Sequence, residues 1–462
     1  MAVVNSELYN ASRAYLSAAL QLLEERCGDA SKLPREESDE WNEVGANFHL
    51  QRRSKPDWAV CIRRVEEEMH ALPEYVGVME QLNADPTVSQ HLDAMVGSSM
   101  GGSRIEASGL ADSFIWHSLN RLNSYEFSGE VFNEDYTALE TELYSDIVES
   151  VTLMPLAGFS SAVVPLKLTD QVSIIKLSVS QIRKCIKAGL IRPMLIDRII
   201  ISPPRYAIQI LHSLPKVIKR DREMEDRSER DLKDAQEFFS REDATLEAVV
   251  AALRVFRRGT VRPLGKLGYD ARKLSLGEGL TFAPKATYPY GDYSLTESEA
   301  ESFLAICRIL NSDKVRKNKS LSTAIRRFNY SADRERLEDR MLDLMIAGEA
   351  LFLSGTTEEL RYRFALRAAS FIEAPGWSRE QVFRFMRLAY DVRSKIAHGD
   401  DLPKLSMPDL PTVELQSFVD TTENRLRSAL HRALEIAGRT TGTWPPNWDE
   451  VILFSRAERL DY

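Results

Sequence analysis

Cysteine is scarce in this chain and follows no pattern. The 462 residues include four cysteines, and no two of them form a CxxC pair. Zinc ribbons and redox motifs need that close spacing, and disulfide frameworks are typical of small secreted domains. We therefore expect no disulfide and a reducing cytosol. The four residues are Cys27, Cys61, Cys185 and Cys307.

Long apolar runs are also lacking. The first residues, MAVVNSELYN, have neither the basic flank nor the continuous apolar stretch of a signal peptide. No run elsewhere approaches the ~20 apolar residues that cross a bilayer. The sequence favours a cytoplasmic protein with no membrane partner.

Basic residues are fewer than acidic ones, 60 against 69. The formal net charge of -9 argues against a protein that coats nucleic acid through general electrostatics, although it leaves a local RNA site open. One basic cluster is either such a local patch or a solvated face. It consists of Lys314, Arg316, Lys317, Lys319, Arg326 and Arg327.

Motifs for metal chemistry and for serine hydrolysis are missing. The sequence has no HExxH and no GxSxG, and all but one of its seven histidines are isolated from any metal-binding spacing. We therefore expect no metal and no cofactor. The isolated histidines are His49, His70, His91, His117, His212 and His431.

The chain is long enough for two or three domains, and its composition is that of a soluble folded protein. The expected fold class is mainly α with a mixed α/β middle region. Residues 1–150 are expected to be mostly helical, because 12–26 and 57–72 carry apolar residues at three- and four-residue spacing. The glycine- and serine-rich segment 96–104 is expected to be a flexible connection, since no GK[ST] follows to make it a phosphate loop.

The sequence pattern of residues 151–290 predicts a mixed α/β domain. Short β-rich runs, such as SAVVPLKL, QVSIIKL, DRIIIS and YAIQILHSL, are separated by proline, glycine or polar residues. The segment 219–239 alternates in charge and is expected to be an exposed helix or a mobile insertion. The segment 279–294, rich in glycine, proline and tyrosine, is the expected domain boundary.

Residues 295–440 read as a helical bundle, followed by a C-terminal extension at 441–462. Thr296 and Glu299 suit a capping box that opens the first helix. Short connections favour an antiparallel arrangement. Further helices are expected at 331–353, 358–372 and 413–436.

The helix after Ser378 is the most informative part of this bundle. Ser378 and Gln381 form its expected capping box, and Gly399 is expected to end it. An apolar stripe at alternating three- and four-residue spacing predicts one buried face. The stripe consists of Val382, Phe385, Ala389, Val392 and Ile396.

This helix ends with the sequence YDVRSKIAHG, residues 390–399. It resembles the signature of the HEPN superfamily, in which an arginine is followed after four to six residues by a histidine at the end of a bundle helix. Residues 390–399, 324–353 and 359–373 are similar to the Apea-like branch, and 151–178 resemble the domain upstream in such proteins. The resemblance implies an antiparallel HEPN bundle with endoribonuclease activity, a composite cleft across a homodimer, and products with a cyclic phosphate at the 3′ end.

Arg393 and His398 are the catalytic candidates. RNA can be cleaved without metal because the neighbouring ribose hydroxyl is an internal nucleophile. Histidine suits the proton transfers and an arginine fork suits the phosphate oxygens. Five residues of regular helix turn through about 500°, which leaves the two side chains roughly 140° apart. They can converge only if the last turn loosens or a second protomer supplies partners.

Other polar residues are candidates for supporting roles. Ser394 and Lys395 either contact the RNA phosphate or face water. Glu349 and Arg367 either orient the catalytic pair or form a salt bridge within the bundle. Asp343 is a weaker candidate of the same kind.

The resemblance predicts an endoribonuclease effector, with tRNA as one candidate among its RNA substrates. It implies a role in antiviral defence or abortive infection, in which residues 1–290 sense a phage or cellular trigger. Two alternatives stay open. One is a non-catalytic RNA-binding or protein-interaction module, and the other is a toxin–antitoxin component.

Overall fold

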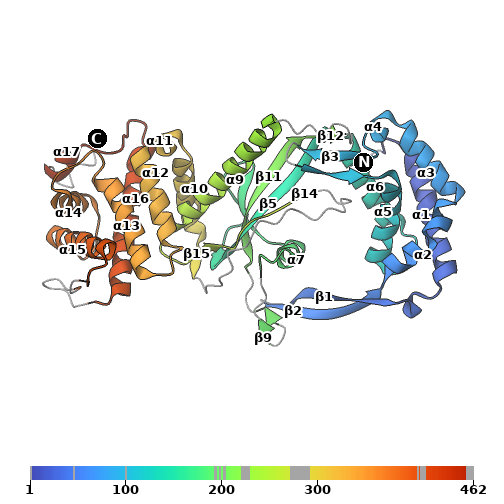
Figure 1. Cartoon of the computed structure of the whole chain (residues 1–462), viewed down its shortest axis with the longest axis horizontal. Helices are drawn as coiled ribbons and strands as arrows, with labels where there is room; N and C mark the ends of the chain where they lie inside the picture. Colours follow the sequence, from blue (N-terminus) through green and yellow to red (C-terminus); the bar gives the residue numbers. More distant parts are fainter. Residues whose placement is uncertain are drawn as a thin grey trace.

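The computed structural model of the chain describes residues 3–44, 47–98, 101–191, 195–196, 199–200, 204–219, 229–270, 292–402, 405 and 413–453. The described part of the chain is mainly α-helical, as predicted. Its sheet with the most strands lies in the middle region. Figure 1 shows three regions in a row: N-terminal helices, a sheet region and a C-terminal helical bundle. Within the described residues, no helix is both long and apolar enough to cross a membrane.

The N-terminal region consists largely of helices packed around one apolar core. Tyr15, Trp58, Phe132 and Tyr136 are its largest buried rings. The helices are α1 (Ser6–Cys27), α2 (Trp58–His70), α3 (Pro73–Ala84), α4 (Pro86–Ser89), α5 (Ala107–Leu122) and α6 (Gly129–Tyr144), with a 3-10 turn, η1 (Ala30–Lys32), after α1. Helices α1 and α2 cover the two segments in which helical spacing is evident from the sequence.

Two β-hairpins interrupt these helices, and neither was predicted. Strands β3 (Ala94–Ser98) and β4 (Gly101–Ile105) pair antiparallel, so the prediction of a flexible connection at 96–104 is wrong for the described residues of that segment. Strand β3 also pairs with β12 (Val217–Lys219) on its other side. A backbone ladder on both sides of β3 therefore orders a stretch whose glycines and serines suggested freedom.

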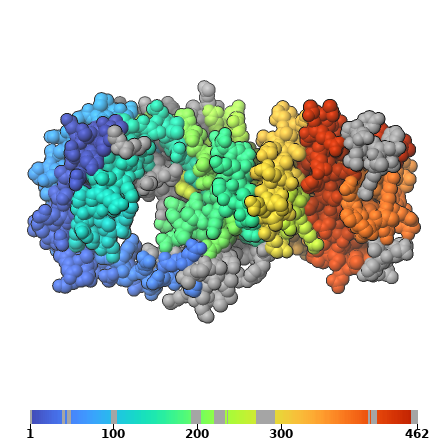
Figure 2. Space-filling model, turned by 180° about the vertical axis from the view of Figure 1, so that it is seen from behind, coloured from blue at the N-terminus to red at the C-terminus, as the bar shows by residue number. Residues whose placement is uncertain are grey.

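The second hairpin, β1 (Arg35–Val44) and β2 (Asn47–Pro56), reaches from the N-terminal region to the middle one. Its strand β2 pairs with β10 (Ile199–Ile200), which pairs with β9 (Leu195–Ile196). The hairpin bounds one side of an opening through the molecule that is visible in Figure 2. The chain thus connects its first two regions by strand pairing as well as by sequence.

The middle region is an antiparallel sheet with a helix packed against each face. Its strand order is β13-β5-β11-β8-β7, and β14 also pairs with β5. Leu156 and Ile208 share a core with helix α9, whereas Leu153 and Ala207 share one with helix α7, because neighbouring residues of a strand face opposite sides. The elements are β5 (Ile147–Ala157), β6 (Phe159–Ser161), β7 (Leu166–Lys167), β8 (Val172–Lys176), α7 (Val179–Lys187), β11 (Tyr206–Pro215), α9 (Glu229–Phe256), β13 (Arg262–Pro263) and β14 (Leu267–Asp270).

Helix α9 begins inside the charged segment 219–239, for which an exposed helix or a mobile insertion was predicted. Residues 229–239 form its first turns, and its second half is buried against the sheet and the bundle. Residues 220–228, and most of the boundary predicted at 279–294, lie outside the described residues.

The C-terminal region is a helical bundle that shares a core with α9. The expected capping box of Thr296 and Glu299 is present, and it opens a 3-10 turn before the first helix. The helix expected at 331–353 begins only at Leu337, because Ser331 ends a separate helix. The elements are β15 (Tyr293–Leu295), η2 (Glu297–Glu299), α10 (Ala300–Leu310), α11 (Asp313–Arg316), α12 (Lys319–Ser331), α13 (Leu337–Phe352), α14 (Leu360–Phe371), α15 (Arg379–His398), α16 (Leu415–Gly438) and α17 (Trp448–Leu453).

The described part of the segment 441–462 belongs to this bundle. Trp444 and Trp448 are buried and their rings contact Phe371 at 5.5 and 5.8 Å between centroids. The described part of the C-terminal extension therefore packs onto the bundle, because its tryptophans complete the core.

Candidate functional site

Helix α15 carries both predicted catalytic residues near its C-terminal end. It starts with the expected capping box, in which the Gln381 N–H donates to Ser378 Oγ at 3.1 Å and the Ser378 N–H donates to Gln381 Oε1 at 2.8 Å. The predicted apolar stripe packs into the bundle, with its first four residues buried and Ile396 half-buried. The rotation of α15 about its axis is thereby set.

The last turn of α15 stays α-helical up to His398 and closes in a Schellman motif. Gly399 has a left-handed φ of 72°, and the Asp400 N–H donates to the Lys395 carbonyl at 3.0 Å. The loosening that would bring the two predicted catalytic residues together does not occur. Because the helix is regular, Arg393 and the exposed His398 remain roughly 140° apart, and one protomer does not unite them.

Arg393 is held from the bundle side by Glu349 of α13. Its Nη2 lies 3.4 Å from Glu349 Oε2, and its side chain remains 31% exposed. Burial raises the pKa of Glu349, and the Arg393 charge opposes that rise. Burial also raises the pKa of Tyr390, with the Glu349 charge adding to the effect. The pair is long for a charge-assisted bond, which leaves the guanidinium capacity for a further anion.

The two polar residues between them differ in their surroundings. Lys395 is exposed and its Nζ lies 2.9 Å from Asp400 Oδ2, a contact that lowers the pKa of Asp400. Ser394 is half-buried next to Arg393. Both lie at the same helix end as the catalytic candidates.

Two supporting residues proposed from the sequence lie elsewhere. Asp343 is buried and binds Arg327 at 2.9 Å and Arg334 at 2.6 Å, which fastens α12 to α13. Arg367 donates to the Phe352 carbonyl at 2.6 Å and so caps the end of α13. Neither contacts Arg393, because each is occupied by partners of its own helix pair. Of the three proposed supporting acidic and basic residues, the structure places only Glu349 against the candidate site.

The predicted basic patch is partly engaged in the same way. Lys314 donates to the carbonyls of Arg439 and Thr440, at 2.8 and 2.9 Å. Lys317 pairs with Asp313 at 2.7 Å. Both ammonium groups are thus already bound within the chain, which weighs against a local RNA patch at these two residues.

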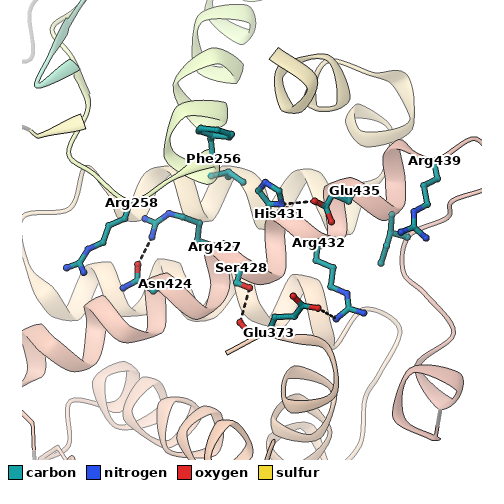
Figure 3. Close-up of a pocket in the computed structure, with 12 residues that line it drawn as sticks. Phe256, Arg258, Glu373, Asn424, Arg427, Ser428, His431, Arg432, Glu435 and Arg439 are labelled. Carbon is teal, nitrogen blue, oxygen red and sulfur yellow. Dashed lines mark hydrogen bonds and ion pairs between the residues drawn. The ribbon is translucent and has the colours of Figure 1, made fainter. Parts of the chain in front are cut away.

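A pocket that sequence reasoning missed lies between the end of α9 and helix α16 (Figure 3). Its volume is about 460 Å³, and Arg258, Arg427 and His431 are among the residues that line it. His431 Nδ1 lies 3.1 Å from Glu435 Oε1 on the same helix. The pocket marks the place where the middle region meets the bundle.

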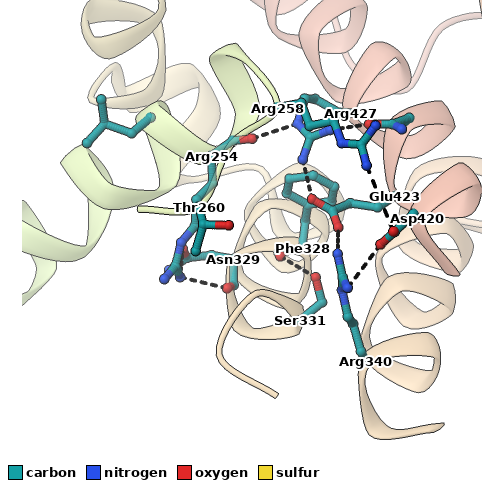
Figure 4. Close-up of polar contacts among 12 residues, drawn as sticks. Arg254, Arg258, Thr260, Phe328, Asn329, Ser331, Arg340, Asp420, Glu423 and Arg427 are labelled. Atoms are coloured by element: carbon teal, nitrogen blue, oxygen red, sulfur yellow. Dashed lines mark hydrogen bonds and ion pairs between the residues drawn. The ribbon is translucent and has the colours of Figure 1, made fainter. Parts of the chain in front are cut away.

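Arg427 of α16 fastens that junction (Figure 4). Its Nε donates to the Arg254 carbonyl of α9 at 2.8 Å and its Nη1 to Asn424 Oδ1 at 2.7 Å. It also pairs with Glu423, which pairs with Arg340 of α13. Burial lowers the pKa of Arg427, and the Glu423 charge works against that change. The four-residue spacing of Glu423 and Arg427 is visible in the sequence, but the burial of Arg427 is not.

Arg254 extends the junction to α12. Its guanidinium is buried and donates to Asn329 Oδ1 at 2.7 Å and to Asp333 Oδ1 at 2.7 Å. Helix α9 of the middle region is thus bonded to both α12 and α16 of the bundle.

The end of α15 offers an exposed imidazole and a half-buried guanidinium, which are groups for proton transfer and for binding an anion. Neither needs a metal to do so. Comparisons with family models, with curated proteins and with solved structures found no match to the chain.

Proposed function

We propose that residues 295–440 form a HEPN-type domain and that the protein is a metal-independent endoribonuclease. The observation that carries this proposal is the end of α15, where Glu349 holds Arg393 with part of its guanidinium open to solvent. His398 stands exposed at a helix end that Gly399 fixes. The mainly α architecture and the resemblance of residues 390–399 support the same function.

In the proposed reaction, a ribose 2′ oxygen attacks the adjacent phosphorus and the bond to the 5′ oxygen breaks. The products are a 2′,3′-cyclic phosphate and a 5′-hydroxyl end. His398 accepts the proton of the 2′-hydroxyl or donates one to the leaving oxygen. Arg393 neutralises charge on the equatorial phosphorane oxygens. Ser394 and Lys395 lie where they could contact the neighbouring phosphates.

The proposed site is completed by a second copy of the chain. Within one protomer, Arg393 and His398 point away from each other, so each cleft needs groups from the same helix end of the partner. A two-fold homodimer through α15 supplies them. Size measurement across a range of protein concentrations tests this part of the proposal, because a strictly monomeric active enzyme would contradict it.

In this proposal the first 290 residues sense a phage or cellular trigger and hold the untriggered nuclease at a low basal rate, and the experiment below measures that basal cleavage. The bonds of Arg254 and Arg427 support that role, because they join α9 to two bundle helices. The effector role in defence rests on the resemblance, and so does tRNA as one candidate substrate.

One observation favours a second candidate, a non-catalytic RNA-binding module. The Arg393 guanidinium faces Glu349, and the regular helix turns His398 away from it. Such an arrangement could bind a phosphate without cleaving the chain. An RNA that is retained uncut would identify this function.

The decisive experiment incubates the purified full chain with total RNA and with tRNA in EDTA. We expect cuts that leave cyclic phosphate ends and a loss of about 100-fold or more in Arg393→Ala and in His398→Ala. Arg387→Ala is the matched control, since Arg387 is an exposed arginine of the same helix. Its cleavage rate should equal that of the unchanged protein.

Cleavage that survives in His398→Ala would overturn the assignment of that residue. RNA binding without cleavage, measured by gel shift on the same samples, would replace the nuclease by the binding module. Neither binding nor cleavage, by the protein or by any variant, would count against both functions.

A further inference from the structure

Three possible metal ligands meet where helix α2 contacts helix α5. Glu66 and His70 are four residues apart on α2, so they lie on one face of that helix. Asp112 comes from α5, and its Oδ2 lies 2.9 Å from His70 Nε2. The ligand atoms of all three lie within 4.8 Å of one another. This cluster is in the N-terminal region, whereas Arg393 and His398 are in the C-terminal bundle.

Two tyrosines contact two of these ligands, Asp112 and His70. The Tyr15 hydroxyl donates to Asp112 Oδ1 at 2.7 Å, which directs the other carboxylate oxygen toward His70. Burial raises the pKa of Tyr15, so it is a neutral donor. The His70 ring stacks on Tyr75 with 4.2 Å between centroids and 17° between planes. A carboxylate that ligates a metal is typically hydrogen-bonded through its other oxygen, as Asp112 is to Tyr15, and this bond sets its orientation.

The cluster has a net negative charge, which favours a bound cation. Glu66 and Asp112 bring two carboxylates together, and His70 adds a positive charge only when it binds a proton. Among the ion pairs of the described residues, no lysine or arginine is paired with either carboxylate. Glu66 is exposed and His70 and Asp112 are half-buried, so an ion could enter from solvent.

We propose that Glu66, His70 and Asp112 bind a divalent first-row transition-metal ion, with Zn²⁺ as the best fit. Bonds of about 2.0–2.2 Å in a tetrahedral site put ligand atoms roughly 3.4 Å apart. The His70 to Asp112 separation needs a small increase and Glu66 a small inward swing. An imidazole nitrogen in the set disfavours Mg²⁺ and Ca²⁺, which prefer oxygen ligands. Three ligands leave a fourth position for water or another ligand.

The sequence alone indicates only two of the three proposed ligands. The Glu-x3-His spacing of Glu66 and His70 is visible in α2, but it is neither HExxH nor part of a CxxC pair. Asp112 lies 42 positions further along and reaches the others only because α5 packs on α2. The site is independent of the proposed nuclease, which is expected to work in EDTA.

The test is calorimetric titration of the untagged full chain, freed of metal by EDTA and dialysis, with Zn²⁺ at pH 7.5. We expect a saturable site that weakens at least tenfold in Glu66→Gln and in His70→Gln. Glu67→Gln is the matched control, because it removes the same charge from the neighbouring exposed residue of the same helix. Mg²⁺ at the same concentrations should give no saturable binding.

Substitution by Co²⁺ gives a second readout, since a tetrahedral site with a nitrogen ligand has visible absorption bands. These bands should be present in Glu67→Gln and lost in Glu66→Gln. Zn²⁺ binding that is equal in Glu66→Gln and Glu67→Gln would overturn the proposal, and so would the absence of a saturable site. Circular dichroism of each variant shows whether it is folded, and exposed Glu66 is the position least able to disturb folding.

Discussion

Arg393 of α15 and Arg427 of α16 are both arginines on long helices of one bundle, yet their surroundings differ greatly. Arg427 is 8% exposed, and its Nε and both terminal nitrogens each have a partner. Arg393 has a 31% exposed side chain and one contact of 3.4 Å. Arg427 therefore has the full set of partners of a structural residue. Arg393 keeps most of its hydrogen-bonding capacity.

This difference separates stability from function within one domain. A buried guanidinium with full partners cannot be removed without leaving other groups unpaired. A loosely paired one can be removed at little cost to the fold, so a role in binding an anion is the better reason for its presence. Four substitutions in the bundle follow from this contrast.

The largest effect is expected for Arg427→Met, which keeps much of the side-chain volume and removes the charge. We expect a loss of about 3–5 kcal/mol in the free energy of unfolding, the usual cost of removing one partner of a buried pair. The Arg254 carbonyl and Asn424 lose their donor, while Arg340 still faces Glu423, which favours the lower end.

Arg393→Met is the matched substitution and should cost less than about 1 kcal/mol, as partly exposed pairs do. Urea unfolding followed by circular dichroism measures both. Equal losses in the two variants would contradict the distinction between a structural and an available arginine.

A smaller effect is expected for Gly399→Ala at the end of α15. Gly399 has a φ of 72°, and a Cβ there would meet no atom within 4 Å. The cost is therefore backbone strain alone, about 1 kcal/mol. Gly376→Ala is a matched control, because it has a φ of 77° and equally open space. A loss much larger than that of the control would show that the His398 turn is held by more than its glycine.

How far the sequence predicts this bundle follows from how local each signal is. Ser378, Gln381 and Gly399 act through neighbours within a few residues, and the structure has the capping box and the left-handed end where they were predicted. The apolar stripe of α15 is local in the same sense. The mainly α class follows from several such segments.

What could not be predicted depends on partners far along the chain. Glycine and serine at 96–104 suggested flexibility, but pairing of β3 with β12, more than a hundred residues away, orders the segment. The depth of Arg427 depends on α9, and the position of Arg367 depends on the end of α13. The contact of Glu349 with Arg393 was one of two readings that the sequence left open.

The smallest effect, and the sharpest test of the loose pair, is expected for Glu349→Gln. Burial raises the pKa of Glu349 above its ordinary value of 4.5, so the native state holds this proton more tightly than the unfolded state. Protein stability contributed by this group is therefore present below that value and is lost as pH rises through the native pKa. Glutamine has no proton to lose, so the variant should gain relative to the unchanged protein between pH 4 and pH 7.

The relative gain should stay under about 1 kcal/mol, because the Glu349 side chain is 22% exposed and Arg393 partly offsets its burial. Urea unfolding at pH 4, 5.5 and 7 measures it, with Glu338→Gln as an exposed control on α13. If the variant instead loses relative stability as pH rises, the ion pair with Arg393 outweighs burial. Arg393 would then be a structural residue like Arg427, and the main argument for its availability to RNA would fail.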